Sequence, residues 1–192
     1  IVDSSYTQGY KETTDKKTSG SRNHIFANFT HNFSKKENSY SDLEINLEHV
    51  SNDTYLEVHD VKSELVESEK HILRNELKYQ YQDEEEYFGL IATAYEDMNK
   101  TDRSKYEYVL PNIVYERNLI SNEKIGIIDL YTNAIAKNYN VNHTTKFLVN
   151  NVGWRSKSFN NAAGIQSNFE GLLKLVTYEA ENTNNYKNEE FN

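Results

Sequence analysis

Carboxylates are the most concentrated chemical groups in this sequence, with a run of four from Asp83 to Glu86. A calcium loop needs oxygen ligands at fixed offsets and a glycine at its sharp turn, and that spacing is missing here. Catalytic pairs of carboxylates are defined by their separation in space, and thirty acidic residues would produce some pairs by chance. The run is therefore predicted to be a solvated hairpin tip.

Histidine, serine and glycine form no recognisable catalytic or metal-binding motif either. No serine lies in a Gly-x-Ser-x-Gly elbow, and the seven glycines form no phosphate-binding loop. The six histidines include no His-Glu-x-x-His pair and no tight cluster: His24, His31, His49, His59, His71 and His143. We expect no enzymatic activity, no cofactor and no metal site.

The composition favours strands with one modest apolar face and one wet face. Only 36% of the 192 residues are hydrophobic, 27% are charged, and the mean hydropathy is -0.86. Fifteen Tyr and eight Phe argue against plain disorder, which is poor in aromatic residues. A net charge of -9 disfavours nucleic acid as a partner, because nucleic-acid binding usually needs a concentrated basic face.

No segment approaches the roughly twenty apolar residues of a membrane helix, although a barrel strand crosses a membrane with about ten. The chain has no cysteine, so disulfides and thiolate metal sites are excluded and the redox compartment stays open. It begins at Ile1 without a methionine or a signal peptide and ends at Asn192 without an obvious closing element. We expect a piece of a longer protein.

The segment 105–119 contains the only proline and has the clearest strand pattern. Tyr106, Tyr108 and Leu110 alternate with Glu107 and Val109, and the apolar phase changes around Pro111. Proline has no N–H to donate to a sheet ladder, so it marks either an edge strand or a bulge. The change of phase favours the bulge.

Similar alternation predicts about nine strands joined by polar turns. The expected strands are 4–13, 23–33, 42–50, 71–81, 87–96, 105–119, 124–137, 145–155 and 159–169, with 172–178 extending the last or beginning another. Turns are expected at 15–21, 34–39, 82–85, 97–104 and 138–143, and 51–69 is left open between a short helix and an irregular loop. The predicted fold is all-β, an antiparallel up-and-down meander.

A meander of this length must protect its edges by forming a sandwich or by closing into a barrel. Strands of ten or more residues that are polar on one face throughout favour a large transmembrane β-barrel, of which this chain would be a part, over a sandwich of five- or six-residue strands. Many tyrosines fall near expected strand ends, where a barrel carries its aromatic girdle, although general β-propensity in a sandwich also explains them. They are Tyr6, Tyr10, Tyr79, Tyr81, Tyr87, Tyr95, Tyr106, Tyr108, Tyr115, Tyr131 and Tyr139.

The strand 42–50 shows the two faces most clearly. In a barrel, its acidic face would line the lumen with Glu44, Asn46 and Glu48, and its apolar face would meet lipid with Leu43, Ile45 and Leu47. We expect Ile45→Lys to cost about 2–4 kcal/mol and Asn46→Lys to be mild.

Five segments resemble the barrel domain of the LPS-assembly protein (LptD) family, also called organic solvent tolerance proteins. They are YTQGYK at 6–11, SRNHIFANF at 21–29, HVSNDTYLEVHDV at 49–61, YEYVLPNIVYERNL at 106–119 and FNNAAGIQSNFEGLLKLV at 159–176. The resemblance extends over nearly all of 1–192. The family's periplasmic jelly roll, its disulfide cysteines and the closing strands of its barrel have no counterpart here.

This resemblance implies a segment of a roughly 26-stranded barrel in the bacterial outer membrane. The parent protein would insert lipopolysaccharide into the outer leaflet. Its partners would be an LptE-like plug lipoprotein and, through the missing N-terminal domain, a periplasmic LPS-bridge protein. The acidic balance further suggests divalent-cation bridging to anionic lipopolysaccharide at the loops.

Two other functions stay open from the residues alone. One is a soluble or surface β-sandwich that binds carbohydrate through exposed tyrosines and Trp154. The other is a different outer-membrane barrel, such as a porin or receptor, which the composition fits equally well.

Overall fold

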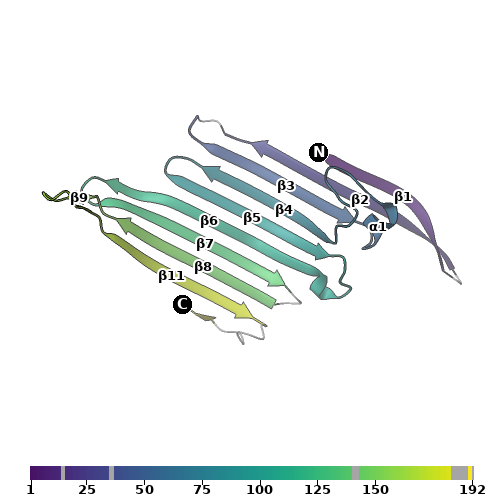
Figure 1. Ribbon diagram of the computed structural model, residues 1–192. Coiled ribbons are helices and arrows are strands. Elements are labelled where there is room, and N and C mark those ends of the chain that lie inside the picture. Colours follow the sequence, from purple (N-terminus) through teal and green to yellow (C-terminus); the bar gives the residue numbers. More distant parts are fainter. Residues whose placement is uncertain (14–15, 35–36, 140–142, 183–189, 192) are drawn as a thin grey trace.

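Long antiparallel strands follow one another across one sheet in the order of the sequence (Figure 1). The structure, a computed structural model, describes residues 1–13, 16–34, 37–139, 143–182 and 190–191. The expected all-β meander is thereby confirmed. The strands of the sheet are β1 (Val2–Thr13), β2 (Lys16–Asn32), β3 (Tyr40–Val50), β4 (Ile72–Gln82), β5 (Glu86–Asp97), β6 (Tyr106–Asn122), β7 (Gly126–Tyr139), β8 (His143–Arg155), β11 (Glu170–Glu181) and the two-residue β12 (Glu190–Phe191).

The sheet is open. Strand β1 forms one edge, and β11 forms the other except where β12 pairs with Tyr178 and Glu179. The expected barrel is therefore not closed by the described residues. Backbone groups along the outer sides of β1 and most of β11 have no strand to pair with in this part of the chain.

Pro111 lies at a bulge, as its sequence context predicts. The register between β6 and β7 shifts between Val109 and Asn112, and the register between β5 and β6 shifts between Ile91 and Thr93. An extra residue without a ladder partner accommodates the missing proline N–H, so β6 continues past it to Asn122.

Two expectations about turns and strands are wrong. The segment 16–21, expected as part of a turn, belongs to β2 and pairs with 8–13 of β1, because a hairpin ladder of backbone groups tolerates polar residues. The segment 159–169, expected as a strand, is a small hairpin of β9 (Phe159–Asn160) and β10 (Gln166–Ser167). Asn161 causes this reversal, since its Oδ1 accepts hydrogen bonds from the N–H groups of Ala163 and Ile165, both at 2.9 Å.

The segment 51–71 contains the short helix α1 (Tyr55–His59), and it forms the one compact hydrophobic core among the described residues. The 3₁₀ turn η1 (Arg103–Lys105) lies before β6. Tyr55, Leu56 and Val66 of the segment pack with sheet residues, all less than 9% exposed: Phe26, Val50, Leu73 and, just after β5, Met98. Elsewhere the sheet is a single layer (Figure 1).

Candidate functional site

The register of the strands sorts the side chains onto two faces of the sheet, because residues paired across antiparallel strands point to the same side. One row runs across seven strands and is almost wholly apolar: Leu43, Tyr79, Leu90, Ile113, Ala134, Leu148 and Thr177. We call the side that carries this row the apolar face. The opposite side, which carries Glu44, Asn46 and Glu48, is called the polar face.

The apolar face is uncovered along the sheet. Leu47 is 49% exposed, Leu77 39%, Leu148 39%, Leu173 72% and Leu175 56%. A soluble protein normally buries such a contiguous surface against a second layer. This face therefore needs an apolar environment, and the predicted lipid-facing residues Leu43, Ile45 and Leu47 all belong to it.

Aromatic side chains border the apolar face at both ends of the strands. Near the turn at 83–85, Tyr81, Phe88 and Tyr115 form one cross-strand row. At the other end, Tyr106 and Tyr108 stack with ring centroids 6.5 Å apart. The aliphatic residues Leu77, Leu90 and Ile113 lie between these two groups.

The eleven tyrosines singled out in the sequence do not all lie on one face. Tyr6, Tyr79, Tyr81, Tyr106, Tyr108 and Tyr115 share the apolar face. Tyr87, Tyr95, Tyr131 and Tyr139 lie on the polar face, and the side chain of Tyr10 lies outside the described part of the chain. Alternation separates the two faces within one strand, but the register is needed to tell which faces of neighbouring strands lie on the same side of the sheet.

The polar face is charged over β3 and β4. Glu44 lies 3.8 Å from Lys78, and Glu76 accepts a hydrogen bond from Thr93 Oγ1 at 3.0 Å and pairs with Arg74. Over β7 to β11 the same face carries an apolar row of Ile135, Phe147 and Tyr178, and the ring centroids of Phe147 and Tyr178 are stacked 5.7 Å apart. The expectation of a face that is polar throughout is therefore wrong for the C-terminal strands.

Glu48 differs from its neighbours on the polar face because it is 7% exposed. Its carboxylate accepts hydrogen bonds from Lys70 Nζ at 2.6 Å, from Arg74 N at 2.7 Å and from Asn46 Nδ2 at 3.0 Å. The Asn75 amide bridges the Glu48 backbone, accepting from its N–H at 2.9 Å and donating to its carbonyl at 3.0 Å. Where β3 and β4 separate, side-chain hydrogen bonds thus take the place of backbone pairing. Glu48 lies beneath the segment 51–71 and holds it to the sheet through Lys70.

A Ser-His-Asp series also lies on this side, between residues far apart in the sequence. Ser5 Oγ is 3.1 Å from His24 Nδ1, and His24 Nε2 is 3.3 Å from Asp3 Oδ1. Tyr55 OH lies 2.7 Å from Ser5 Oγ and 3.3 Å from His24 Nδ1. Since Tyr55 belongs to the buried core and occupies the serine hydroxyl, the series holds α1 against β1 and β2.

The loop before β6 binds the segment 51–71 from its other side. Lys105 Nζ lies 2.5 Å from Asp53 Oδ1 and 2.8 Å from Glu96 Oε1. Partial burial opposes the charge on Lys105, but hydrogen bonds to Asp53 and Glu96 outweigh it and raise the pKa of Lys105 above its ordinary value. Lys105 is therefore a permanent cation that ties 51–71 to β5.

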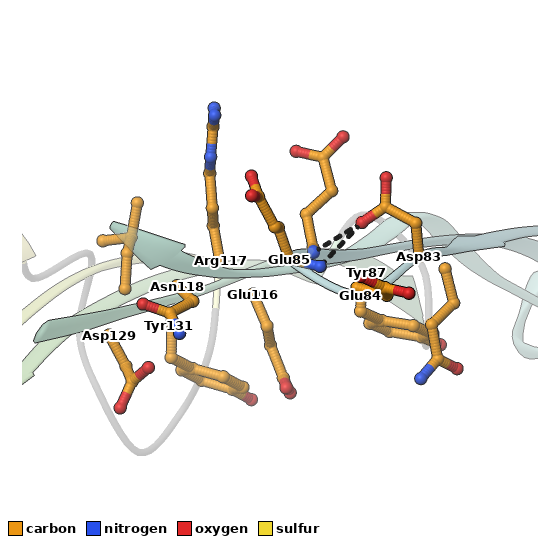
Figure 2. Close-up of a pocket in the computed structure, with 12 residues that line it drawn as sticks. Asp83, Glu84, Glu85, Tyr87, Glu116, Arg117, Asn118, Asp129 and Tyr131 are labelled. Carbon is orange, nitrogen blue, oxygen red and sulfur yellow. Dashed lines mark hydrogen bonds between the residues drawn. The ribbon is translucent and has the colours of Figure 1, made fainter. Parts of the chain in front are cut away.

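An acidic depression of about 440 Å³ lies at the turn end of β4 to β7 (Figure 2). Asp83 Oδ1 closes the hairpin tip by accepting from the N–H groups of Glu85 and Glu86, both at 2.9 Å. Figure 2 shows Glu116 and Tyr131 on one side of the strands and Arg117 on the other. Among the described residues, no three His, Asp or Glu side chains gather around a common metal position.

Comparison with known proteins identifies no relative: no protein-family model, curated protein or solved structure matches this chain. The residues that the structure describes contain no helix long and apolar enough to cross a membrane. A function for the chain therefore has to follow from the two faces of its sheet.

Proposed function

We propose that this chain forms part of the wall of a bacterial outer-membrane β-barrel. The observation that carries the proposal is a single-layer antiparallel meander whose apolar face is uncovered across seven strands. In a barrel wall, that face contacts lipid and the opposite face lines the lumen. Under this proposal Leu43, Ile45 and Leu47 meet lipid, and Glu44 and Asn46 face the lumen.

The spacing of the aromatic residues fits the thickness of a membrane. Tyr106 and Tyr115 pair with Glu96 and Phe88, which are eight residues apart on β5, because one residue of β6 lies in the bulge. Eight residues correspond to about 26 Å at ~3.3 Å per residue. A strand tilt of about 40° reduces this to about 20 Å along the membrane normal, comparable with the ~25 Å apolar band of outer-membrane barrels. The two aromatic groups would then lie at the two membrane interfaces.

The open edges support a larger barrel. Among the described residues, the outer side of β1 and most of the outer side of β11 have no neighbouring strand, and unpaired backbone groups cannot persist in lipid. Further strands must therefore pair with both edges. This requirement agrees with the large barrel that the sequence resemblance implies.

We propose lipopolysaccharide assembly as the function of that barrel, on the residue-level resemblance to the LptD family. The partners we propose are lipopolysaccharide, an LptE-like plug lipoprotein inside the barrel and a periplasmic LPS-bridge protein. The apolar row of Ile135, Phe147 and Tyr178 on the luminal side supports the plug, because a water-filled lumen leaves such a surface exposed.

The soluble carbohydrate-binding sandwich is less well supported. A sandwich packs a second sheet about 10 Å from the first, and its apolar residues become buried between them. Here Leu173 and Leu175 remain 72% and 56% exposed. A barrel with another cargo, such as a porin, would share the two faces and differ only in what passes through the lumen.

Single-cysteine labelling tests the barrel: residues 1–192 contain no native cysteine, and any cysteine elsewhere in the longer protein is replaced by serine. Ile113→Cys and Val114→Cys are adjacent on β6 and lie on opposite faces. Each would carry a nitroxide label in outer membranes of cells that make the protein. We expect the label at 113 to collide mainly with lipid-soluble oxygen and the label at 114 with a water-soluble nickel chelate. Equal accessibility at the two positions would overturn the proposal.

The cargo requires a separate test. Cells depleted of the protein should display several-fold less lipopolysaccharide at their surface while total lipopolysaccharide is unchanged. If surface lipopolysaccharide stays normal while the label at Ile113→Cys is exposed to lipid, the barrel proposal stands and the proposal of lipopolysaccharide assembly is wrong.

A further inference from the structure

The hairpin formed by β9 and β10 is the most exposed part of the described chain. Phe159 is 44% exposed, Ile165 59% and Phe169 62%, and residues 157–175 are exposed throughout. In Figure 1 the hairpin extends beyond the ends of the neighbouring strands. Its apolar side chains are not used by the sheet, by the core beneath 51–71 or by the acidic depression.

The hairpin is nevertheless well ordered by hydrogen bonds. At its base, Ser156 N donates to the Phe169 carbonyl and Phe169 N donates to Ser156 Oγ, both at 2.8 Å. At its tip, Asn161 N donates to the Ile165 carbonyl at 3.0 Å. Phe159 and Phe169 meet edge to face with ring centroids 6.0 Å apart. A fixed backbone thus presents two aromatic rings outward.

The charge of the hairpin contrasts with that of the turn at 83–85, which lies at the same end of the sheet. Residues 156–169 contain a single charged side chain, Lys157, whose Nζ lies 5.6 Å from the centre of the Phe159 ring. The turn at 83–85 contains three carboxylates in a chain whose net charge is -9. The hairpin is therefore a weakly cationic, aromatic surface at the end of the sheet that also carries an acidic turn.

The hairpin is also continuous with the apolar face. Trp154, the only tryptophan, precedes it on the same face as Ile128, and its Nε1 donates to the Ile125 carbonyl at 2.8 Å. Leu173, on the strand that follows the hairpin, lies on that face and is 72% exposed. Tryptophan and phenylalanine beside a lysine are typical of the boundary between lipid headgroups and acyl chains.

We propose that this hairpin is a membrane anchor, with Phe159, Ile165 and Phe169 inserted at the acyl boundary and Lys157 beside lipid phosphates. The inference rests on the proposed barrel, since it assumes that the apolar face meets lipid. It adds a specific lipid contact at one corner of the wall. One lysine near an anionic surface is worth about 1 kcal/mol, or about fivefold in affinity, so the aromatic rings supply most of the anchoring.

The same nitroxide method tests the anchor. Ile165→Cys reports on the hairpin, Glu84→Cys on the acidic turn at the same end of the sheet, and Ile113→Cys on the barrel wall. We expect the ratio of oxygen to nickel-chelate collisions to be several-fold higher at 165 than at 84. Replacing Phe159 and Phe169 by Ser should lower the ratio at 165 to that at 84 and leave the ratio at 113 unchanged.

The outcomes separate the two proposals. A lipid-exposed label at 113 with a water-exposed label at 165 overturns the anchor and keeps the barrel. A water-exposed label at 113 overturns the barrel, and the anchor with it. A label at 165 shielded from both reagents means that another protein covers the hairpin, which also overturns the lipid anchor. If the double serine variant fails to fold, the collision ratios at 165 and 84, each measured in the otherwise unaltered chain, still decide whether the hairpin contacts lipid.

Discussion

At the scale of single residues, the face on which a side chain lies matters more than its type. Ile113 pairs with Leu90 and Ala134 on the apolar face, while the adjacent Val114 pairs with Gly89 and Asn133 on the polar face. Both are β-branched, half-buried and central in β6. Replacing each of them by the same residue therefore shows how the face on which a side chain lies affects stability.

We expect Ile113→Lys to destabilise the membrane-inserted protein by about 2–4 kcal/mol, because a lysine near the bilayer midplane is costly. Val114→Lys should cost much less, since its ammonium group can reach luminal water. Urea unfolding of the two variants in lipid vesicles measures the difference. Equal losses would contradict the assignment of the faces.

Glu48 and Glu44 provide a second matched pair, four residues apart on β3 and on the same face. Glu48→Gln replaces a buried carboxylate that accepts hydrogen bonds from Lys70 Nζ and the Arg74 backbone N–H. We expect the free energy of unfolding to fall by about 2 kcal/mol. Glu44→Gln alters a 3.8 Å pair with Lys78 that is open to solvent, and should cost less than about 0.5 kcal/mol. Thermal unfolding, monitored by circular dichroism, measures the stability of the two variants. A larger loss of stability in Glu44→Gln than in Glu48→Gln would refute the structural role of Glu48.

At the scale of elements, the segment 51–71 behaves as a folded unit laid on the polar face. Leu56 is 1% exposed in its core, while Val58 of the same helix is 65% exposed. We expect Leu56→Ala to cost about 2–5 kcal/mol locally and to make 51–71 readily cleaved by protease. Val58→Ala is the control and should leave the cleavage rate unchanged. Comparable cleavage of both variants would mean that the segment is not held by its core.

At the scale of the whole molecule, the unpaired edges determine how the chain behaves alone. An exposed edge strand recruits other strands, so we expect the isolated chain in detergent to form assemblies larger than a monomer. Light scattering coupled to gel filtration measures their mass. A stable monomer would show that the edges are satisfied within the chain, and the larger barrel would then be unnecessary.

The sequence alone determined the strands, their polar turns and the bulge at Pro111, because these depend on alternation and on backbone chemistry local to each segment. It also separated Leu43, Ile45 and Leu47 from Glu44, Asn46 and Glu48, since neighbours in a strand must point to opposite sides. It failed at 16–21, where backbone pairing overrides a turn-like composition, and at 159–169, where the Asn161 side chain reverses the chain.

Only the tertiary structure decided which faces of neighbouring strands join into one surface. Register joins residues far apart in sequence, so it alone shows that Ile135, Phe147 and Tyr178 form an apolar row on the polar face at β7 to β11. It also shows that Glu48 is buried, because Lys70 and Asn75 reach it across more than twenty residues of chain. Alternation specifies the two sides of a strand, whereas the surface that a sheet presents depends on pairing and on what folds over it.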